Sequence, residues 1–174
     1  LSGSAALRVG AGLVYLGVPS LLASIYDAAL LEAVIIPLED EGCGILSKKC
    51  MDQVRDKLGR MSVVAFGPGV STEEDIQDIL QDIVDNSKVP IVLDADGLNV
   101  LAKDISILGR AKTDMVLTPH PGEMSRLTGM SIKEIQSNRI EVARDFALKW
   151  KVTLVLKGSK TVAAFPDGSI FINN

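Results

Sequence analysis

Near-continuous runs of Val, Ile, Leu and Ala alternate with amphipathic stretches along the chain, and this alternation constrains the fold more than any other feature. Runs that are apolar at nearly every position are typical of strands covered on both faces, because half-buried strands alternate apolar and polar residues instead. Strands joined by helices in this way predict a right-handed, mostly parallel α/β layer. The predicted strands are Leu13–Val18, Ala33–Ile36, Ser62–Phe66, Ile91–Asp94, Met115–Thr118 and Val152–Lys157.

Local signals place helices between these strands. Ser71–Glu74 has a capping serine followed three residues later by a glutamate, which predicts a helix from Ser71 to about residue 85. Ser131–Glu134 has the same pattern before a predicted long helix that ends at Trp150. Ser47 is expected to begin a third helix.

A turn signal near the end of the sequence predicts an antiparallel hairpin. Pro166–Gly168 joins the runs Thr161–Phe165 and Ser169–Ile172, and such a turn between two strand-like runs favours a hairpin at one edge of the sheet. The sequence has no internal repeat, low-complexity tract or linker, and a length of 174 residues suits one domain. We therefore expect a single domain covering residues 1–174.

Charge and composition argue against nucleic acids and membranes as partners. Eighteen basic and 22 acidic side chains give a net charge of −4, and only four Phe, two Tyr and one Trp are present, whereas nucleic-acid surfaces need clustered basic residues or stacking aromatics. The uncharged stretch Val9–Tyr26 is long enough to be considered as a membrane span, but glycines and a proline interrupt it. A buried helix end followed by a strand is the favoured interpretation.

The two cysteines, Cys43 and Cys50, have neither the number expected of a disulfide framework nor the spacing of a zinc site. They are expected to be reduced thiols, which indicates a cytoplasmic protein.

Both ends of the sequence are typical of the interior of a chain. No initiator Met is present, Leu1–Arg8 resembles the middle of a helix, and the last strand-like run stops at Asn173 and Asn174. We therefore expect the fold to be incomplete at both termini.

Four predicted strands end in loops rich in glycine or polar residues, and open parallel sheets bind ligands at the carboxyl ends of their strands. The loops are Gly67–Gly69, Asp94–Gly97, Thr118–Glu123 and Lys157–Thr161. Their coincidence at one edge predicts a single ligand site.

The first and last of these loops are candidates for binding a nucleotide. Gly67 and Gly69 let the backbone approach a ligand closely, and a helix starting near Ser71 would offer free N–H groups to phosphate. A tight strand-to-helix turn is the alternative. Lys157–Thr161 supplies cations, a glycine and two hydroxyls that can meet phosphate or sugar, although it is not a P-loop.

Two aspartates follow the strand at residues 91–94. Asp94 and Asp96 could hold the water shell of Mg²⁺ or a ribose hydroxyl. The alternative for Asp96 is that it caps a short helix containing Asn99 and Leu101. Asp94 lies in an apolar strand and is harder to explain as a cap.

His120 is the single histidine, and no G-x-S-x-G nucleophile motif accompanies it. Pro119 and Pro121 restrict the backbone on both sides, so the loop would present the imidazole and the Glu123 carboxylate rigidly. This arrangement suits a hydrogen-bonding site, and a purely structural histidine is the alternative.

Five segments resemble the NAD(P)H-hydrate dehydratase family of ribokinase-like, nucleotide-dependent repair enzymes. They are Arg8–Val14, Phe66–Gly69, Val92–Asn99, Leu117–Met124 and Val155–Gly158. The match runs in order over almost the whole chain, and the Thr-Pro-His-Pro-Gly-Glu and Asp-Ala-Asp-x-Leu-Asn blocks are specific to that family.

The resemblance implies a three-layer ribokinase-like fold and a repair reaction. Hydrated NADH or NADPH would be phosphorylated on its new hydroxyl by ADP or ATP, with Mg²⁺, and would then lose phosphate. The whole enzyme is expected to be a homo-oligomer.

The resemblance also implies which residues bind. The hydrate-binding positions are Gly67, Gly69, His120, Pro121, Gly122, Glu123 and Arg126. The nucleotide-binding positions are Lys157, Gly158, Ser159, Lys160 and Thr161. Asp94, Asp96 and Asn99 are candidate supporting residues, and no metal ligand is assigned.

The family's catalytic base is the aspartate of a Gly-Ser-Gly-Asp block, which would follow Asn174. No catalytic residue is therefore assigned within the sequence, and a polypeptide limited to residues 1–174 is expected to lack dehydratase activity.

Two other functions stay open from the sequence. A kinase for hydroxymethylpyrimidine or hydroxyethylthiazole would share the fold, and the Thr-Pro-His-Pro-Gly-Glu loop argues against it. A non-catalytic nucleotide-binding module would keep the fold without the chemistry.

Overall fold

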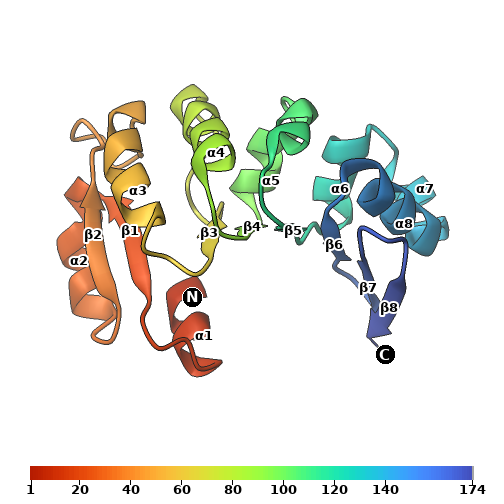
Figure 1. Cartoon of the computed structure of the whole chain (residues 1–174), viewed down its shortest axis with the longest axis horizontal. Coiled ribbons are helices and arrows are strands. Elements are labelled where there is room, and N and C mark those ends of the chain that lie inside the picture. Colours follow the sequence, from red (N-terminus) through yellow and green to blue (C-terminus); the bar gives the residue numbers. More distant parts are fainter. Residues whose placement is uncertain (174) are drawn as a thin grey trace. The chain divides into compact units, whose positions relative to one another are not determined.

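The computed structural model describes residues 1–173 and divides into two compact units, one formed by residues 1–57 and one that begins at Leu58 (Figure 1). Asn174 lies outside the described residues. The single domain expected over residues 1–174 stays a prediction.

The first unit contains a small parallel sheet. Strands β1 and β2 pair from Tyr15 opposite Val34 to Pro19 opposite Leu38, which confirms the two strands expected here. The elements are α1 (Ser2–Arg8), β1 (Tyr15–Pro19), a 3-10 turn (Ser20–Leu22), α2 (Ala23–Ala29), β2 (Val34–Leu38), a second 3-10 turn (Lys48–Cys50) and α3 (Met51–Leu58).

Two local expectations for this unit have different outcomes. The Ser47 hydroxyl accepts a hydrogen bond from the Lys49 N–H and caps the 3-10 turn that leads into α3, which confirms Ser47 as a helix start. The expected buried helix end at Val9 is wrong, because Val9 follows the last residue of α1 and is exposed. Cys43 is exposed and Cys50 is buried, and neither forms a disulfide.

The second unit contains a six-stranded sheet in the order β3-β4-β5-β6-β7-β8. Strands β3 to β6 are parallel, and β6, β7 and β8 pair antiparallel. This confirms a mostly parallel sheet with an antiparallel hairpin at one edge. The strands are β3 (Val64–Phe66), β4 (Ile91–Leu93), β5 (Met115–Leu117), β6 (Thr153–Leu156), β7 (Thr161–Ala164) and β8 (Ile170–Asn173).

The register of the parallel strands places their carboxyl ends side by side. Phe66 pairs with Leu93, Leu93 pairs with Leu117, and Leu117 pairs with Leu154. The loops that follow β3, β4 and β5 therefore leave the sheet at the same level, and β6 continues two residues further to Leu156.

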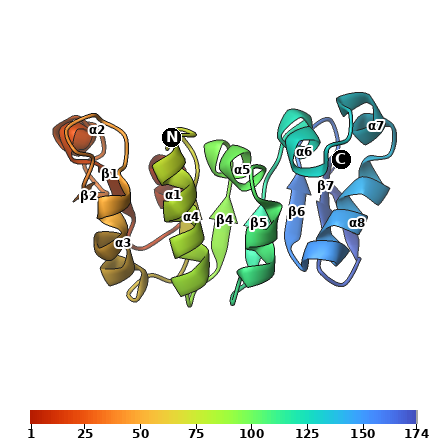
Figure 2. The ribbon, with the colours of Figure 1, turned by 90° about the horizontal axis from the view of Figure 1, so that it is seen from above.

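Helices pack on one face of this sheet, with α4 and α8 on the same side of the strands in Figure 2. The strand side chains on the packed face, such as Leu93 and Leu117, are fully buried, whereas the alternating Val92 and Val116 are partly exposed. Coverage of both faces, and with it the third layer, stays a prediction for the described residues. The helices are α4 (Glu74–Asn86), α5 (Asp96–Leu101), a 3-10 helix (Ile105–Arg110), α6 (Pro121–Thr128), α7 (Ile132–Ser137) and α8 (Arg139–Trp150).

The helix start predicted at Ser71 is wrong. Ser71 has a φ of +76°, a left-handed conformation that cannot begin a helix, and α4 starts at Glu74 after Glu73 without a side-chain cap. The Ser71 N–H donates to Asp96 Oδ2 instead, so a tertiary contact overrides the local capping pattern.

The capping box predicted at Ser131 is confirmed. The Ser131 hydroxyl accepts from the Glu134 N–H at 3.3 Å, and the Glu134 carboxylate accepts from the Ser131 N–H at 2.8 Å. The single long helix expected to follow is divided at Asn138 into α7 and α8. Among residues 1–173, no helix has the length and apolar character needed to cross a membrane.

Candidate functional site

The four loops predicted to form one site are linked by backbone hydrogen bonds. The Asp94 N–H donates to the Phe66 carbonyl at 3.2 Å, the Thr118 N–H donates to the Leu93 carbonyl at 3.1 Å, and the Lys157 N–H donates to the Pro119 carbonyl at 2.8 Å. Each strand end is thus bonded to the next one across the sheet. The structure brings the four loops together at one edge of the second unit.

At one end of this edge, which we call the first corner, the backbones of Gly67 and Gly97 lie in close contact. A Cβ on Gly67 would lie 1.9 Å from the Asp94 carbonyl oxygen and 2.7 Å from the Gly97 nitrogen. A Cβ on Gly97 would lie 3.0 Å from the Gly67 Cα. The close approach predicted between Gly67 and a ligand is therefore an approach to the chain's own backbone. Gly69, with a φ of +76° and nothing within 4 Å of its Cβ position, leaves open space.

Asp96 connects this corner to two other candidate residues. Its Oδ2 accepts from the Ser71 N–H at 3.2 Å, and its Oδ1 lies 3.5 Å from Asn99 Nδ2. The Asn99 amide oxygen accepts from the Arg126 guanidinium at 3.0 Å. The alternative that Asp96 caps α5 is wrong, because Ala95 occupies the N-cap position and Asp96 is the first helical residue.

Asp94 and Lys157 form an ion pair across the strand ends, with 2.6 Å between Nζ and Oδ1. Burial raises the pKa of Asp94, but hydrogen bonds from Lys157, Thr118 and the Ala95 N–H outweigh it, so the pKa lies below its ordinary value. The carboxylate is therefore ionised and the ammonium is paired. The side chains are 36% and 41% exposed, so an anion can still reach Lys157.

His120 caps helix α6. Its Nδ1 accepts from the Gly122 N–H at 2.9 Å and from the Glu123 N–H at 3.4 Å, and the Glu123 carboxylate accepts from the His120 N–H at 2.8 Å. The interpretation of His120 as a structural residue is thus correct for its Nδ1 atom, which caps the helix. Because Nδ1 accepts, the neutral ring carries its proton on Nε2, which lies 3.4 Å from the buried Glu123 carboxylate.

The neighbours of His120 fit this cap. Pro121 occupies the first helical position, where the missing N–H costs no hydrogen bond. A Cβ on Gly122 would lie 2.8 Å from the His120 ring, so glycine leaves room for the imidazole. The His120 side chain is 52% exposed, and its ring is accessible at this edge.

The Lys157–Thr161 loop has an irregular backbone. Gly158 has a φ of +151° and Lys160 a φ of +57°, and the Thr161 hydroxyl donates to the Gly158 carbonyl at 3.2 Å. Gly158, Ser159 and Lys160 are exposed. The loop therefore offers backbone and side-chain donors to a ligand.

Sequence reasoning placed Gly97 in the Asp94–Gly97 loop without assigning it a role, and it missed Arg139. Gly97 is the partner of Gly67, and only the pairing of β3 with β4 reveals it. Arg139 donates to the Leu156 carbonyl at 2.9 Å beneath the Lys157–Thr161 loop. No local signal pointed to Arg139, because the sequence predicts one helix that ends at Trp150 and places residue 139 in its interior, whereas the structure begins α8 there.

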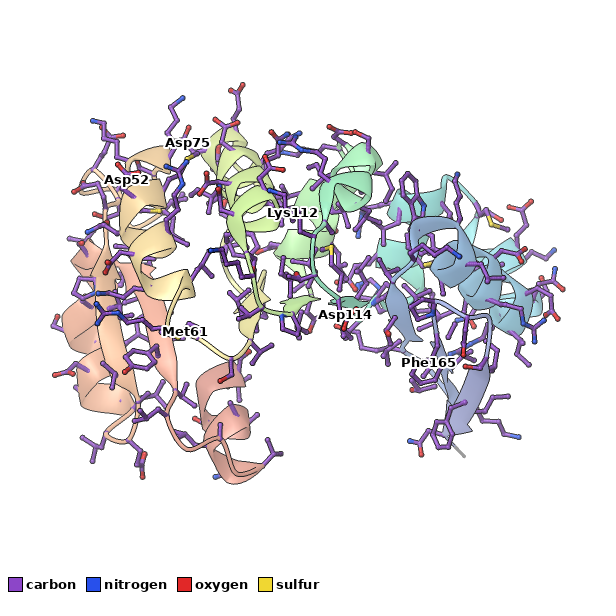
Figure 3. All side chains as sticks on the ribbon, in the orientation of Figure 1. Asp52, Met61, Asp75, Lys112, Asp114 and Phe165 are labelled. Carbon is purple, nitrogen blue, oxygen red and sulfur yellow. The ribbon has the colours of Figure 1, made fainter. Side chains whose placement is uncertain are left out.

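A shallow depression of about 520 Å³ lies at the other end of the strands. It is lined by Lys88, Pro90 and residues 111–114, of which Lys112 and Asp114 are labelled in Figure 3. The buried Thr113 hydroxyl has no hydrogen-bond partner in the described part of the chain. None of the predicted site residues lines this depression.

The comparison with family models decides the affiliation. Residues 1–174 match the model described as NAD(P)H-hydrate dehydratase. The chain belongs to the NAD(P)H-hydrate dehydratase family. The bifunctional NAD(P)H-hydrate repair enzyme Nnr of Moorella thermoacetica is 40% identical over 173 residues, a match that covers 99% of this chain and 33% of that protein. The chain thus spans about a third of the length of this curated relative.

Two solved structures are similar to this chain over nearly its whole length. The ADP/ATP-dependent NAD(P)H-hydrate dehydratase from Bacillus subtilis, co-crystallised with ATP and Mg²⁺, has a TM-score of 0.77 and 28% identity, with 99% of this chain and 57% of that chain covered. A ribokinase-like superfamily protein from Enterococcus faecalis has a TM-score of 0.79 at 20% identity, with 99% and 56% covered, and it shows the fold alone. The predicted ribokinase-like α/β fold is confirmed.

Proposed function

We propose that the protein dehydrates hydrated NADH and NADPH, using ADP or ATP to phosphorylate the hydroxyl of the hydrate before phosphate is eliminated. The observation that carries this proposal is the set of hydrogen bonds that joins the four strand-end loops at one edge. The family affiliation supports it, since the residues that resemble the family's binding motifs all lie in those loops or in the helices that begin at them.

The proposed hydrate subsite lies between the first corner and α6. Gly69 leaves open space, His120 and the residues through Glu123 form a rigid helix start, and Arg126 extends from the same helix to Asn99. A rigid surface of this kind suits the positioning of a substrate, because its donors lose little freedom on binding.

The proposed nucleotide subsite is Lys157–Thr161. Phosphoryl transfer depends on positioning and on stabilising charge, which Lys157 can supply to a phosphate while Asp94 holds its ammonium in place. We assign no catalytic base among the described residues, and the absence of turnover by a polypeptide limited to residues 1–174 stays a prediction.

Mg²⁺ would have to arrive on the nucleotide. No group of three or more His, Cys, Asp or Glu side chains within residues 1–173 is placed to hold a metal ion. Asp94 and Asp96 already accept hydrogen bonds from the chain, so they do not fit as a ready ligand set. Mg²⁺ commonly keeps several waters and binds through substrate phosphates.

We propose further that the protein acts in the cytoplasm as a homo-oligomer and binds small-molecule nucleotides rather than nucleic acids. The net charge of −4 argues against a nucleic-acid surface, and two cysteines without a disulfide suit a reducing compartment. Size-exclusion chromatography with light scattering would measure the oligomeric state, and a purely monomeric protein would contradict the proposal.

The test of the reaction uses the natural full-length protein, hydrated NADPH and ADP or ATP, with recovery of NADPH absorbance as the readout. Lys157→Ala is expected to raise the KM for the nucleotide about tenfold, the effect of losing one charged contact to phosphate. Lys133→Ala, an exposed lysine of α7, is the matched control and should leave the KM unchanged. Turnover of a thiazole or pyrimidine alcohol instead of the hydrate would overturn the proposal.

A further inference from the structure

Arg139 occupies a helix position that electrostatics alone disfavours. It is the first residue of α8, directly after the break at Asn138 that separates α7 from α8. The positive end of the helix dipole lies at this terminus and disfavours a cation there. The contacts of the guanidinium must therefore account for its place.

Those contacts are with the two ends of the proposed nucleotide loop. Arg139 donates from one terminal nitrogen to the Leu156 carbonyl at 2.9 Å and to the Lys160 carbonyl at 3.4 Å. Its other terminal nitrogen donates to Gln136 Oε1 at 3.4 Å. One guanidinium thus bridges the residue before the loop and a residue inside it, while Gln136 fixes it from α7.

Gly158 gives the guanidinium room. A Cβ at Gly158 would lie 2.2 Å from the second terminal nitrogen of Arg139 and 2.9 Å from its Cζ. The guanidinium therefore packs directly against the Gly158 backbone. A side chain at this position would push either the arginine or the loop away.

Holding Arg139 in this position costs free energy. Its Nε is buried and has no hydrogen-bond partner among residues 1–173. A buried donor without a partner costs free energy, and a planar guanidinium that bonds at its far end cannot turn Nε elsewhere without losing the carbonyl contacts.

We propose that Arg139 is the positioning residue of the Lys157–Thr161 loop, fixing the backbone in the conformation that receives the phosphates of a nucleoside diphosphate or triphosphate. This inference rests on the proposed function of the loop. Arg139 acts through Gly158 and the two carbonyls, and it does not itself contact the nucleotide.

The experiment measures ADP and NADPH affinity by calorimetry on the natural full-length protein and on its variants. Arg139→Gln should weaken ADP binding about tenfold while leaving NADPH binding unchanged, since the loss of the bridge frees only this loop. Arg139→Lys should recover only part of the loss, because an ammonium can donate to the carbonyls but has no second terminal nitrogen to donate to Gln136 and pack against Gly158. Arg144→Gln, in the same helix and in a surface pair with Glu141, is the control and should bind both ligands normally.

A double-mutant cycle tests the contact itself. Gly158→Ala should weaken ADP binding in both backgrounds, because a φ of +151° strains an alanine, and the loss should be larger in the natural background than in an Arg139→Ala background, where the guanidinium that meets the new Cβ is gone. Hydrogen exchange of the loop amides gives a second readout. Exchange should rise at residues 157–161 in Arg139→Gln, and it should not rise in Arg144→Gln.

The outcomes separate the two proposals. Failure of the natural protein to bind either ADP or ATP would overturn the proposed function. Normal ADP binding by both the natural protein and Arg139→Gln would overturn the role of Arg139 and leave the proposed function standing. Equal losses of ADP and NADPH affinity, or an equal effect of Gly158→Ala in both backgrounds, would reduce Arg139 to general structural support and would also overturn the inference.

Discussion

The Gly67–Gly69 loop and the Lys157–Thr161 loop each contain a glycine that lies too close to other atoms for a side chain to fit. The atoms that crowd the glycine differ between the two loops. At Gly67 the neighbours are the backbone atoms of Asp94 and Gly97. At Gly158 the neighbour is the end of the Arg139 side chain. Backbone fixed in a sheet cannot move aside, whereas a side chain can adopt another rotamer.

The two ends of the binding edge are therefore held in different ways. The first corner lies at Gly67, and the second corner is the Lys157–Thr161 loop. The first corner is fixed by the packing of main chain on main chain, so its geometry is set once the sheet forms. The second corner is held by two side-chain contacts, the Arg139 bridge and the Asp94–Lys157 pair. We therefore expect substitutions at the first corner to act on stability and substitutions at the second to act mainly on binding.

The largest expected effect is at Gly67. Gly67→Ala should lower the free energy of unfolding by roughly 3 kcal/mol or more, because the new Cβ overlaps a carbonyl oxygen and the φ of +127° is strained for alanine. Urea denaturation would measure it. Gly69→Ala is the control and should cost only about 1–2 kcal/mol for its left-handed φ, since its Cβ meets nothing. Equal losses for the two variants would contradict the rigid-corner interpretation.

A smaller effect is expected at His120, in the loop between the two corners. His120→Ala should cost about 1 kcal/mol through the lost cap of α6, and His120→Asn should restore most of it because asparagine is a good cap. Thermal unfolding measures the cap. Weaker NADPH binding by His120→Asn at unchanged stability would assign the ring to the substrate, and unchanged binding would leave His120 as a cap alone.

Asp94 contacts both corners, because its carbonyl lies against Gly67 and its carboxylate pairs with Lys157. Its pKa is lowered in the folded protein, so its charge stabilises the fold above the unfolded value near 3.8, and this contribution is lost as the pH falls through the lower folded pKa. Asp94→Asn should cost about 1 kcal/mol or less at neutral pH, because both partners are more than a third exposed. The difference from the natural protein should vanish in acid. A difference that persists at low pH would contradict the ion pair as its source.

The smallest effect is expected at Ser71. A true capping serine would cost about 1 kcal/mol on replacement by alanine. Ser71 is not the N-cap of α4, so Ser71→Ala should change the free energy of unfolding by less than about 0.5 kcal/mol, as is usual for positions away from a cap or the core. Chemical denaturation of both proteins in parallel would check it, and a full capping loss would restore the helix start that the sequence predicted.

The same residues show which features could be predicted from the sequence. Ile91–Leu93 and the Ser131 cap were predictable because apolar runs and capping boxes are local signals. The loops at the strand ends were predictable as a group because parallel strands end at one edge. Ser71 was not, since its left-handed backbone comes with a tertiary bond to Asp96 that no neighbouring residue announces.

Side-chain partners that are distant in the sequence could not be predicted either. Asp94 and Lys157 are 63 residues apart, and only the strand order brings them together across β5. His120 was identified as a site residue, but its capping bonds depend on where α6 begins. The order of parallel strands predicts which loops meet, whereas the contacts between individual atoms depend on where each strand and helix begins in the folded chain.

The most direct test of the central claim is hydrogen exchange of the backbone amides with and without ADP and NADPH. We predict that both ligands together protect residues 67–71, 94–97, 118–123 and 157–161, with ADP acting on the last of these. Protection at residues 88–90 and 111–114, around the depression at the opposite strand ends, with none at the four loops, would contradict the account.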